Sequence, residues 1–345
     1  MTPHSLDTVG MWELTMGLPE QVGDALAALD DGVAGLPSHD EIGHVVVLGM
    51  GGSGIAGDVV AAVAAPFLPV PVLVVKEYEL PGCVGPDSLV LAVSVSGNTE
   101  ETIEAATEAA LAGAHVVAVC SGGALEGAAH GWGAPVIPLP PIPMPRAAIG
   151  AVSVPVLVVL EEAGLYPGAR QYLRGAQEQL RRRRDELASP AGGWARDLAA
   201  RLAGRVPVVH GGGPVGAAAA TRWKAQFNEN AKVPSWANRI PELSHNELQG
   251  TGPLDARTRE LLALVQLRHD DEHPQVARRF ELVRPAFQAA MGLVEEVRAG
   301  GDGPLAQLFD LVLQGDVVSL HLAAELGVDP GPIPALDALK AALAG

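Results

Sequence analysis

The chain has 345 residues and is acidic, with 40 Asp and Glu against 23 Lys and Arg and a formal net charge of −17. Nucleic acids and anionic membranes bind through basic surfaces, so neither is an expected partner. The length exceeds the usual size of one domain and predicts two domains of roughly 150 residues each.

Apolar, valine-rich runs alternate with helix-like stretches through the first half of the chain. Strands of this kind, separated by helices, are typical of a parallel sheet that is covered on both faces. The pattern therefore predicts a doubly wound α/β domain. The predicted strands are residues 44–50, 69–76, 88–96, 114–121 and 134–140.

A glycine-rich segment, residues 49–58, follows the first predicted strand and opens a helix. Its glycines allow a ligand to approach the backbone closely, and the helix start offers N–H groups to an anion, most simply a phosphate. The spacing also fits a dinucleotide site, for which Glu77 at the end of the next strand could hold a ribose, as in an oxidoreductase. A tight turn without any ligand is the third interpretation.

A second polar loop, "SVSGNTEET" at residues 94–102, follows the third predicted strand and also opens a helix. Three hydroxyls, those of Ser94, Ser96 and Thr99, cluster with the backbone N–H groups of Gly97 and Asn98. A helix cap would account for one hydroxyl but not for three. The loop predicts a compact site that suits a phosphate monoester better than a pyrophosphate.

The second half repeats the first. After a helical stretch from about 150 to 200, the segment from Gly204 matches that from Gly43 at a constant offset of 161 residues. Pro214 takes the place of Ser53 in this copy, so we expect one phosphate site per chain, in the first half. A later strand, 261–269, extends the second sheet, and residues 285–345 are expected to form helices. The predicted domains are 1–155 and 201–345, with a helical connection at 156–200.

These motifs resemble known families. The S-x-S-G-x-T-x-E-T pattern resembles the signature of sugar isomerase (SIS) domains, and two such domains in tandem resemble the phosphoglucose isomerase superfamily. More narrowly, the chain resembles the bifunctional phosphoglucose/phosphomannose isomerase family. The segments that carry this resemblance are 49–58, 144–150, 227–236, 241–250 and 315–330.

The resemblance implies two tandem SIS-type α/β domains with a helical C-terminal tail, and an aldose–ketose isomerase that needs no cofactor. It would interconvert glucose 6-phosphate and mannose 6-phosphate with fructose 6-phosphate through a cis-enediolate. By resemblance, Glu229 moves the proton, His245 opens the sugar ring, Arg146 stabilises the enediolate and Lys340 lies at the sugar. The phosphate would be bound by the Gly52 N–H and by Ser53, Ser94, Ser96 and Thr99.

The resemblance also implies a homodimer with active sites at its interface, to which the partner subunit contributes His245. No His and acidic cluster has the spacing of a metal site, so no metal is expected. The N-terminus lacks the pattern of a secretory signal, and two cysteines do not indicate disulfides, so a cytoplasmic protein is expected. Gly331 stands where the family places a threonine that makes room for either configuration at C2, which leaves mannose 6-phosphate open as a substrate.

Alternative functions remain at this point. A non-catalytic phosphosugar-binding regulator would have no use for Glu229 and His245 and would usually add a basic DNA-binding segment. An amidotransferase-type glucosamine 6-phosphate synthase would need an N-terminal glutaminase domain, and roughly 40 residues precede the first strand. An isomerase of another phosphosugar would share most of the motifs.

Overall fold

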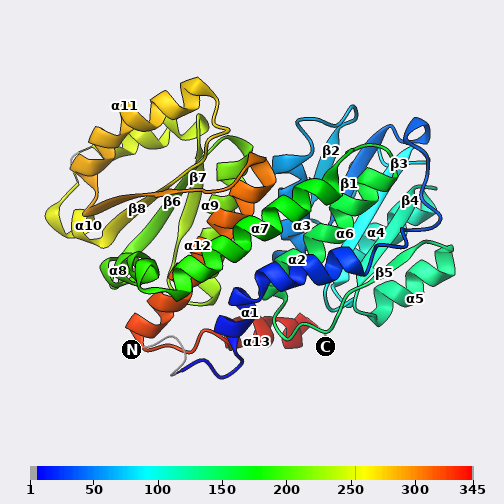
Figure 1. Ribbon diagram of the computed structural model, residues 1–345, viewed down its shortest axis with the longest axis horizontal. Helices are drawn as coiled ribbons and strands as arrows, with labels where there is room; N and C mark the ends of the chain where they lie inside the picture. Colours follow the sequence, from blue (N-terminus) through cyan, green and yellow to red (C-terminus); the bar gives the residue numbers. More distant parts are fainter. Residues whose placement is uncertain (1–5, 253, 344–345) are drawn as a thin grey trace. The chain divides into compact units, whose positions relative to one another are not determined.

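Two compact units make up the chain in the computed structural model, which describes residues 6–252 and 254–343 (Figure 1). The first-sheet unit comprises residues 17–182 and 299–310. The second-sheet unit comprises the chain up to residue 16, residues 183–298 and the chain from residue 311 onward.

The first-sheet unit is built on five parallel strands in the order β2-β1-β3-β4-β5. Each of β1, β3 and β4 is an almost uninterrupted run of buried apolar residues, as expected for strands that are covered on both faces. The doubly wound α/β class predicted from the sequence is confirmed. The strands are β1 (His44–Leu48), β2 (Val72–Val75), β3 (Ser88–Ser94), β4 (His115–Cys120) and β5 (Val136–Pro138).

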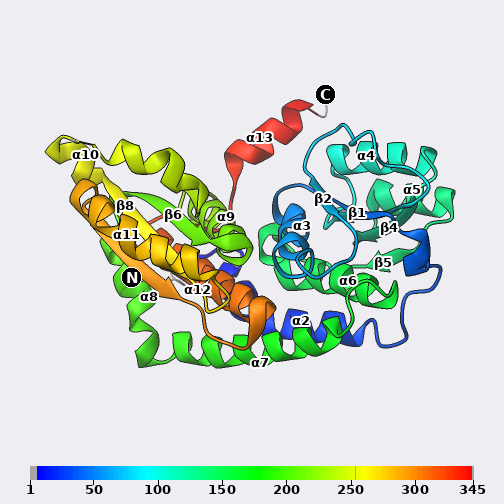
Figure 2. The ribbon, with the colours of Figure 1, turned by 90° about the horizontal axis from the view of Figure 1, so that it is seen from above.

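Helices cover both faces of this sheet (Figure 2). On one face, α4 (Glu100–Leu111) and α5 (Gly123–Trp132) pack alanines and Leu125 against alternate valines of β1, β3 and β4. On the other face lie α3 (Gly51–Val63) and α6 (Ile149–Glu162), which contact each other. Further helical segments of this unit are α2 (Leu18–Ala27), the 3-10 turns η2 (His39–Glu41) and η3 (Pro145–Ala147), and most of α7 (Ala169–Ala188).

The second-sheet unit repeats the plan with four parallel strands in the order β7-β6-β8-β9. On one face, α11 (Pro274–Ala290) packs Phe280 and Phe287 against the sheet. On the other, α9 (Gly213–Glu229) runs along the strands and binds α12 (Gly303–Leu326), since Trp223 Nε1 donates to the Leu311 carbonyl at 2.7 Å. The strands are β6 (Val206–Gly212), β7 (Trp236–Ile240), β8 (Leu262–Arg268) and β9 (Leu293–Arg298).

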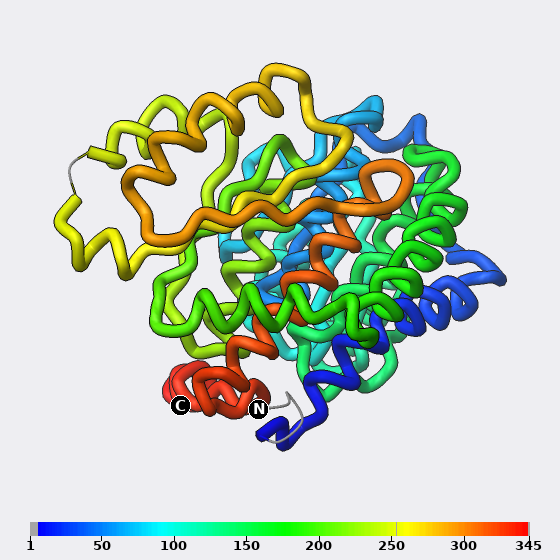
Figure 3. The backbone as a smooth tube through the Cα atoms, turned by 60° about the vertical axis from the view of Figure 1, so that its left-hand side comes forward, coloured from blue at the N-terminus to red at the C-terminus, as the bar shows by residue number. Residues whose placement is uncertain are grey.

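The remaining helical segments of this unit can be followed by colour in Figure 3. They are α1 (Met11–Met16), α8 (Gly193–Leu202), α10 (Ala256–Leu261), α13 (Pro334–Leu343) and the 3-10 turns η4 (Pro190–Gly192), η5 (Glu242–His245) and η6 (Glu247–Thr251). The recurrence of one strand order in both units agrees with the predicted duplication.

Two strands depart from the sequence-based expectations. Residues 293–298 were expected to be helical but form β9, an edge strand parallel to β8. Its sequence, "LVEEVR", is half polar and the strand is mostly only partly buried, since an edge strand is covered less than a central one. The short strand β7 was not predicted, since "WANRI" carries no apolar alternation.

Helix α12 is the one helix in the described part of the chain that is long and apolar enough to cross a membrane, with a mean hydropathy of 1.2 over its best window. Of that window, 94% is buried within the structure, as is usual for a core helix of a globular protein.

Candidate functional site

The first sheet has its strand-order reversal at β1 and β3. The chain leaves β1 through residues 49–50 into α3 and leaves β3 through residues 95–99 into α4. In open α/β sheets, ligands bind beyond the carboxyl ends of the strands at such a reversal. The two loops that the sequence predicted to hold phosphate are therefore neighbours.

Ser53 joins these two loops. Its side chain lies in the first turn of α3, is 5% exposed, and accepts a 3.0 Å hydrogen bond from the Val95 N–H through Oγ. The hydroxyl proton of Ser53 still has to be donated elsewhere, which suits an anion. The Ser53 and Gly54 N–H groups donate to the Met50 carbonyl at 3.0 Å. The helix offers no acceptor to the N–H groups of Gly51 and Gly52, which precede them. Met50, the N-cap residue, provides no side-chain cap for them.

The loop after β3 has both buried and exposed hydroxyls. Ser94 is fully buried and its Oγ lies 2.9 Å from Thr99 Oγ1, whereas Ser96 is exposed. The Asn98 N–H donates to Ser96 Oγ at 3.2 Å, and the Gly97 N–H donates to the Ser94 carbonyl at 3.1 Å. These two N–H groups therefore hold the turn together, contrary to the expectation that they face the anion.

The N-terminus of α4 supplies donors in their place. Thr99 is its N-cap residue, but the side chain of Thr99 makes no capping hydrogen bond. The N–H groups of the first turn thus remain available, and the helix dipole adds to their attraction for an anion. Two uncapped helix N-termini and the hydroxyls of Ser53, Ser96 and Thr99 together form the candidate phosphate site.

Arg146 lies directly beside this site. It belongs to η3, and its side chain is 2% exposed, in contrast to the surface position that is usual for a loop arginine. A Cβ atom on Gly52 would lie only 2.6 Å from the Pro145 carbonyl carbon and 2.7 Å from the Arg146 nitrogen. Because the two backbones touch, glycine is required at position 52, and the backbone of Arg146 is held next to the first turn of α3.

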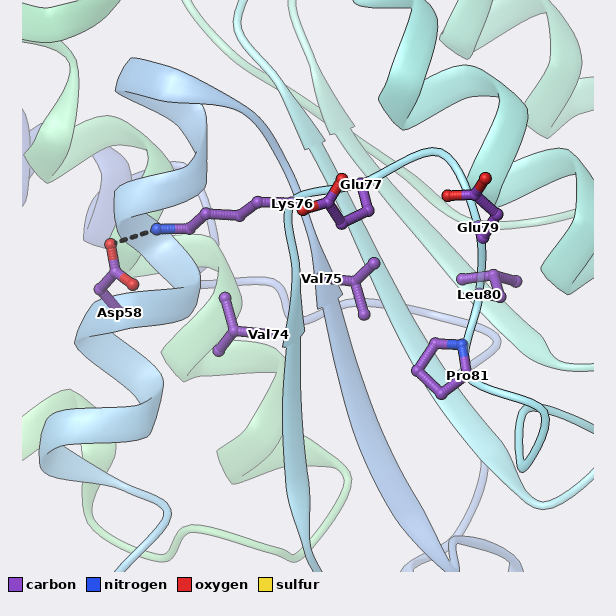
Figure 4. Close-up of a pocket in the computed structure, with 8 residues that line it drawn as sticks. All are labelled: Asp58, Val74, Val75, Lys76, Glu77, Glu79, Leu80 and Pro81. Atoms are coloured by element: carbon purple, nitrogen blue, oxygen red, sulfur yellow. Dashed lines mark hydrogen bonds and ion pairs between the residues drawn. The ribbon is translucent and has the colours of Figure 1, made fainter.

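An open pocket of about 470 Å³ lies at the carboxyl end of β2, beside the glycine loop (Figure 4). Lys76 extends across it to Asp58 on α3, where Nζ and Oδ2 are 2.6 Å apart. The lysine stem also passes Gly54, because a Cβ there would be 3.3 Å from Lys76 Cε. Glu77 lines the pocket, as a ribose-binding acid would. The full lining is Asp58, Val74, Val75, Lys76, Glu77, Glu79, Leu80 and Pro81.

Sequence reasoning missed the Lys76–Asp58 pair. The available signal was a charged residue placed immediately after a buried strand, together with an aspartate on the helix that begins at the glycine loop.

Glu229 belongs to the second-sheet unit and is the last residue of α9, where it is half-buried. The helix end is anchored, since the buried Asn230 donates to Ser319 Oγ on α12 at 2.9 Å and the Lys232 ammonium binds the Glu229 carbonyl. The backbone that carries the Glu229 side chain therefore has a defined position, as the support of a proton-transfer group needs.

His245 also belongs to the second-sheet unit and is the exposed last residue of η5. Glu229 precedes the five-residue strand β7 and His245 follows it. At about 3.3 Å per residue, that strand spans about 16 Å. The unit therefore does not bring Glu229 and His245 to the same edge of its sheet.

Lys340 lies on α13, a helix without buried residues in its described part, and is exposed. Gly331 precedes this helix, and a Cβ there would lie 2.5 Å from Val9 Cγ2. The Val9 side chain thus occupies the space that a larger residue at position 331 would need. The neighbouring Thr8 is held in place, because its hydroxyl donates to Asp329 Oδ2.

Within residues 6–252 and 254–343, no group of three or more His, Cys, Asp and Glu side chains has the arrangement of a metal site. The acidic segment 270–273 contributes instead to structure, since Glu272 forms a bidentate pair with Arg268.

Comparison with known proteins agrees with this architecture. The SIS domain family matches residues 40–128, and the family described as "Bacterial phospho-glucose isomerase C-terminal SIS domain" matches residues 193–343. Among solved structures, the fold of the chain is similar to that of the C-terminal domain of glucosamine-fructose-6-phosphate aminotransferase from Francisella tularensis. The TM-score is 0.69 at 16% identity, over 92% of this chain and 96% of that one.

Two curated relatives extend over most of the chain. A bifunctional phosphoglucose/phosphomannose isomerase from Caldicellulosiruptor bescii is 32% identical over 97% of this chain and 99% of the relative. One from Thermoplasma acidophilum is 32% identical over 86% of this chain and 88% of the relative.

The fold, the duplicated parallel sheets and the serine-rich loop thus define a tandem SIS-domain protein. The chain belongs to the bifunctional phosphoglucose/phosphomannose isomerase family. Family membership favours the phosphosugar interpretation of the glycine loop over the dinucleotide one.

Proposed function

We propose that this protein is a sugar-phosphate isomerase that interconverts glucose 6-phosphate and mannose 6-phosphate with fructose 6-phosphate. The observation that carries the proposal is the family match over 97% of the chain. The convergence of two hydroxyl-bearing loops at the reversal of the first sheet supports it, because such a site fits a phosphate monoester.

The phosphate is bound by the Gly52 N–H, Ser53, Ser96 and Thr99, with the first-turn N–H groups of α4. Ser94 supports the site indirectly, since its buried hydroxyl forms a hydrogen bond with the Thr99 hydroxyl. A phosphate held at this distance from the reacting carbons orients them, and its binding energy lowers the barrier of the chemical step.

The chemistry falls to residues carried over from the family. Glu229 moves a proton between C1 and C2, Arg146 stabilises the charge of the cis-enediolate, and His245 moves a proton between O1 and the ring oxygen to open the ring. Lys340 contributes a further positive charge near the sugar. No metal or other cofactor takes part in this mechanism.

We further propose a cytoplasmic homodimer with two active sites at its interface. The position of Glu229 and His245 at opposite ends of β7 supports this arrangement, since a second copy can bring its own His245 to the Glu229 of the first. A mixture of Glu229→Gln and His245→Ala variants, each inactive alone, should then regain activity on subunit exchange, because one site of the mixed dimer is intact. Failure of every mixture to regain activity would contradict a shared site.

The isomerase proposal is tested by the formation of fructose 6-phosphate from glucose 6-phosphate and, separately, from mannose 6-phosphate, with and without EDTA. EDTA-resistant turnover of both substrates is expected. Turnover of glucose 6-phosphate alone would restrict the specificity and implicate Gly331, whereas turnover of neither would refute the proposal.

A further inference from the structure

A partly buried polar cluster lies within the second-sheet unit, near the carboxyl end of its strands. His210 on β6 is 0% exposed, and its Nε2 lies 2.6 Å from Glu247 Oε1 in η6. The other carboxylate oxygen, Oε2, accepts a 2.7 Å hydrogen bond from Asn238 on β7. The imidazole also packs edge-on against Phe287, with ring centroids 5.0 Å apart. The cluster therefore ties two strands to one loop.

The pairing of the strands places these side chains together. His210 and Asn238 are register partners on the parallel strands β6 and β7, so their side chains point to the same face of the sheet. That face is the apolar one that α11 covers. Of the two imidazole nitrogens, Nε2 meets Glu247, whereas the buried Nδ1 has no hydrogen-bond partner among the described residues. A polar side chain in such surroundings is costly, which argues for a specific role.

The electrostatics agree with an ionised Glu247. Burial alone would raise the pKa of this carboxyl, but the hydrogen bond and the charge of His210 and the hydrogen bond from Asn238 outweigh burial and lower the pKa. Both carboxylate oxygens have a donor, so the side chain is held in one orientation.

His245 lies between two fixed points of the same turn. Two residues before it, Leu243 is fully buried in the cluster with Ile240 and Phe280. Two residues after it, Glu247 is held by His210. Within the turn, Asn246 accepts from the Glu247 N–H at 2.6 Å and donates to Glu242 at 3.1 Å.

We infer that His210, acting through Glu247, is a positioning residue that fixes the turn from which His245 reaches the sugar. The inference rests on the proposed function, because the role of His245 is ring opening in that proposal. Sequence reasoning missed His210, although it replaces Gly49 at the duplication offset and so stands at the entrance of the second, glycine-rich loop.

The test separates ring opening from proton transfer. His210→Leu removes the donor to Glu247, and His210→Gln keeps an N–H at a similar reach. Both variants are assayed on glucose 6-phosphate, which is cyclic. They are also assayed for solvent exchange at C1 of 5-deoxyfructose 6-phosphate, which lacks the hydroxyl that closes the ring. His44→Gln is the matched control, since His44 is a buried histidine of the other unit that bonds Ser88 Oγ at 2.9 Å.

We expect His210→Leu to lower kcat/KM for glucose 6-phosphate by about 10- to 100-fold, the cost of misplacing a catalytic group by a fraction of an ångström to 1 Å. Solvent exchange at C1 of 5-deoxyfructose 6-phosphate should stay at the wild-type rate in His210→Leu. His210→Gln should retain most of the wild-type kcat/KM for glucose 6-phosphate.

Unchanged kcat/KM in His210→Leu would overturn the inference, and so would equal losses on both substrates, which indicate a structural role. An equal loss of kcat/KM for glucose 6-phosphate in the control His44→Gln would also overturn the inference. A wild-type protein that exchanges C1 of the probe but shows no isomerisation of glucose 6-phosphate would refute the proposed function and the inference together.

Discussion

Substitution of Gly52 by alanine probes the contact between the glycine loop and the arginine turn. The added Cβ would lie 2.6 Å from the carbonyl carbon and oxygen of Pro145 and 2.7 Å from the Arg146 nitrogen. Ordinary carbon contacts begin at about 3.5 Å, so the two backbones must separate by about 1 Å. Neither neighbour is the end of a flexible side chain, and the displacement must therefore move η3.

Two measurable effects follow from this displacement. In the proposed mechanism Arg146 would move away from the reacting carbons, and a misplacement of about 1 Å costs about 100-fold in turnover. Overpacking of this kind also lowers the free energy of unfolding by about 1 to 3 kcal/mol. Steady-state isomerisation and urea unfolding of the variant measure the two effects separately.

Gly127→Ala in α5 is the matched control, since a Cβ there meets no atom within 4 Å. It should leave turnover unchanged. Wild-type turnover and stability in Gly52→Ala would refute the argument that the glycine is required for the close approach of the arginine turn.

Three further predictions concern Glu229, Ser96 and His321. Glu229→Gln should lower kcat by at least about 100-fold while sugar-phosphate affinity, measured by calorimetry, is retained; full activity would refute the proton-transfer role. Ser96→Ala should raise KM by about 10-fold or more with a smaller effect on kcat, since a hydrogen bond to a charged group is worth about 1.5 to 3 kcal/mol; an unchanged KM would remove Ser96 from the phosphate site. Burial, with the nearby charge of Arg196, lowers the pKa of His321 to about 4. The unfolded chain takes up this proton below about pH 6.5, so the free energy of unfolding should fall by up to about 2 kcal/mol between pH 7 and pH 5. In His321→Gln that part of the fall should be absent in urea titrations, and an identical fall in both proteins would contradict the assignment.

Much of the first sheet could be predicted because its strands are continuous valine-rich runs bounded by glycine and proline. The predicted strands from 44 to 140 overlap β1 to β5, although all five strands are shorter than predicted, β2 and β5 most of all. The edge strand β9 was missed because the adjacent Glu295 and Glu296, which point to opposite faces of the strand, interrupt its apolar pattern. An edge strand owes its state to pairing with its neighbour, and no local signal reports that pairing.

In the candidate site, too, local motifs could be predicted from the sequence and contacts between distant residues could not. The two hydroxyl loops were found because each is a local motif, and their adjacency follows from the strand order. The internal use of the Gly97 and Asn98 N–H groups was not foreseen, because it depends on the turn geometry of the loop. The His210–Glu247 pair joins residues 37 positions apart on a strand and a turn, and no spacing rule connects them.

The most direct test of the account is deuterium incorporation during turnover in D₂O. A cis-enediolate formed by Glu229 predicts deuterium at C2 of glucose 6-phosphate made from fructose 6-phosphate, and loss of this exchange in Glu229→Gln. Turnover that leaves C2 free of deuterium, or undiminished exchange in the variant, would contradict the proposed proton-transfer mechanism.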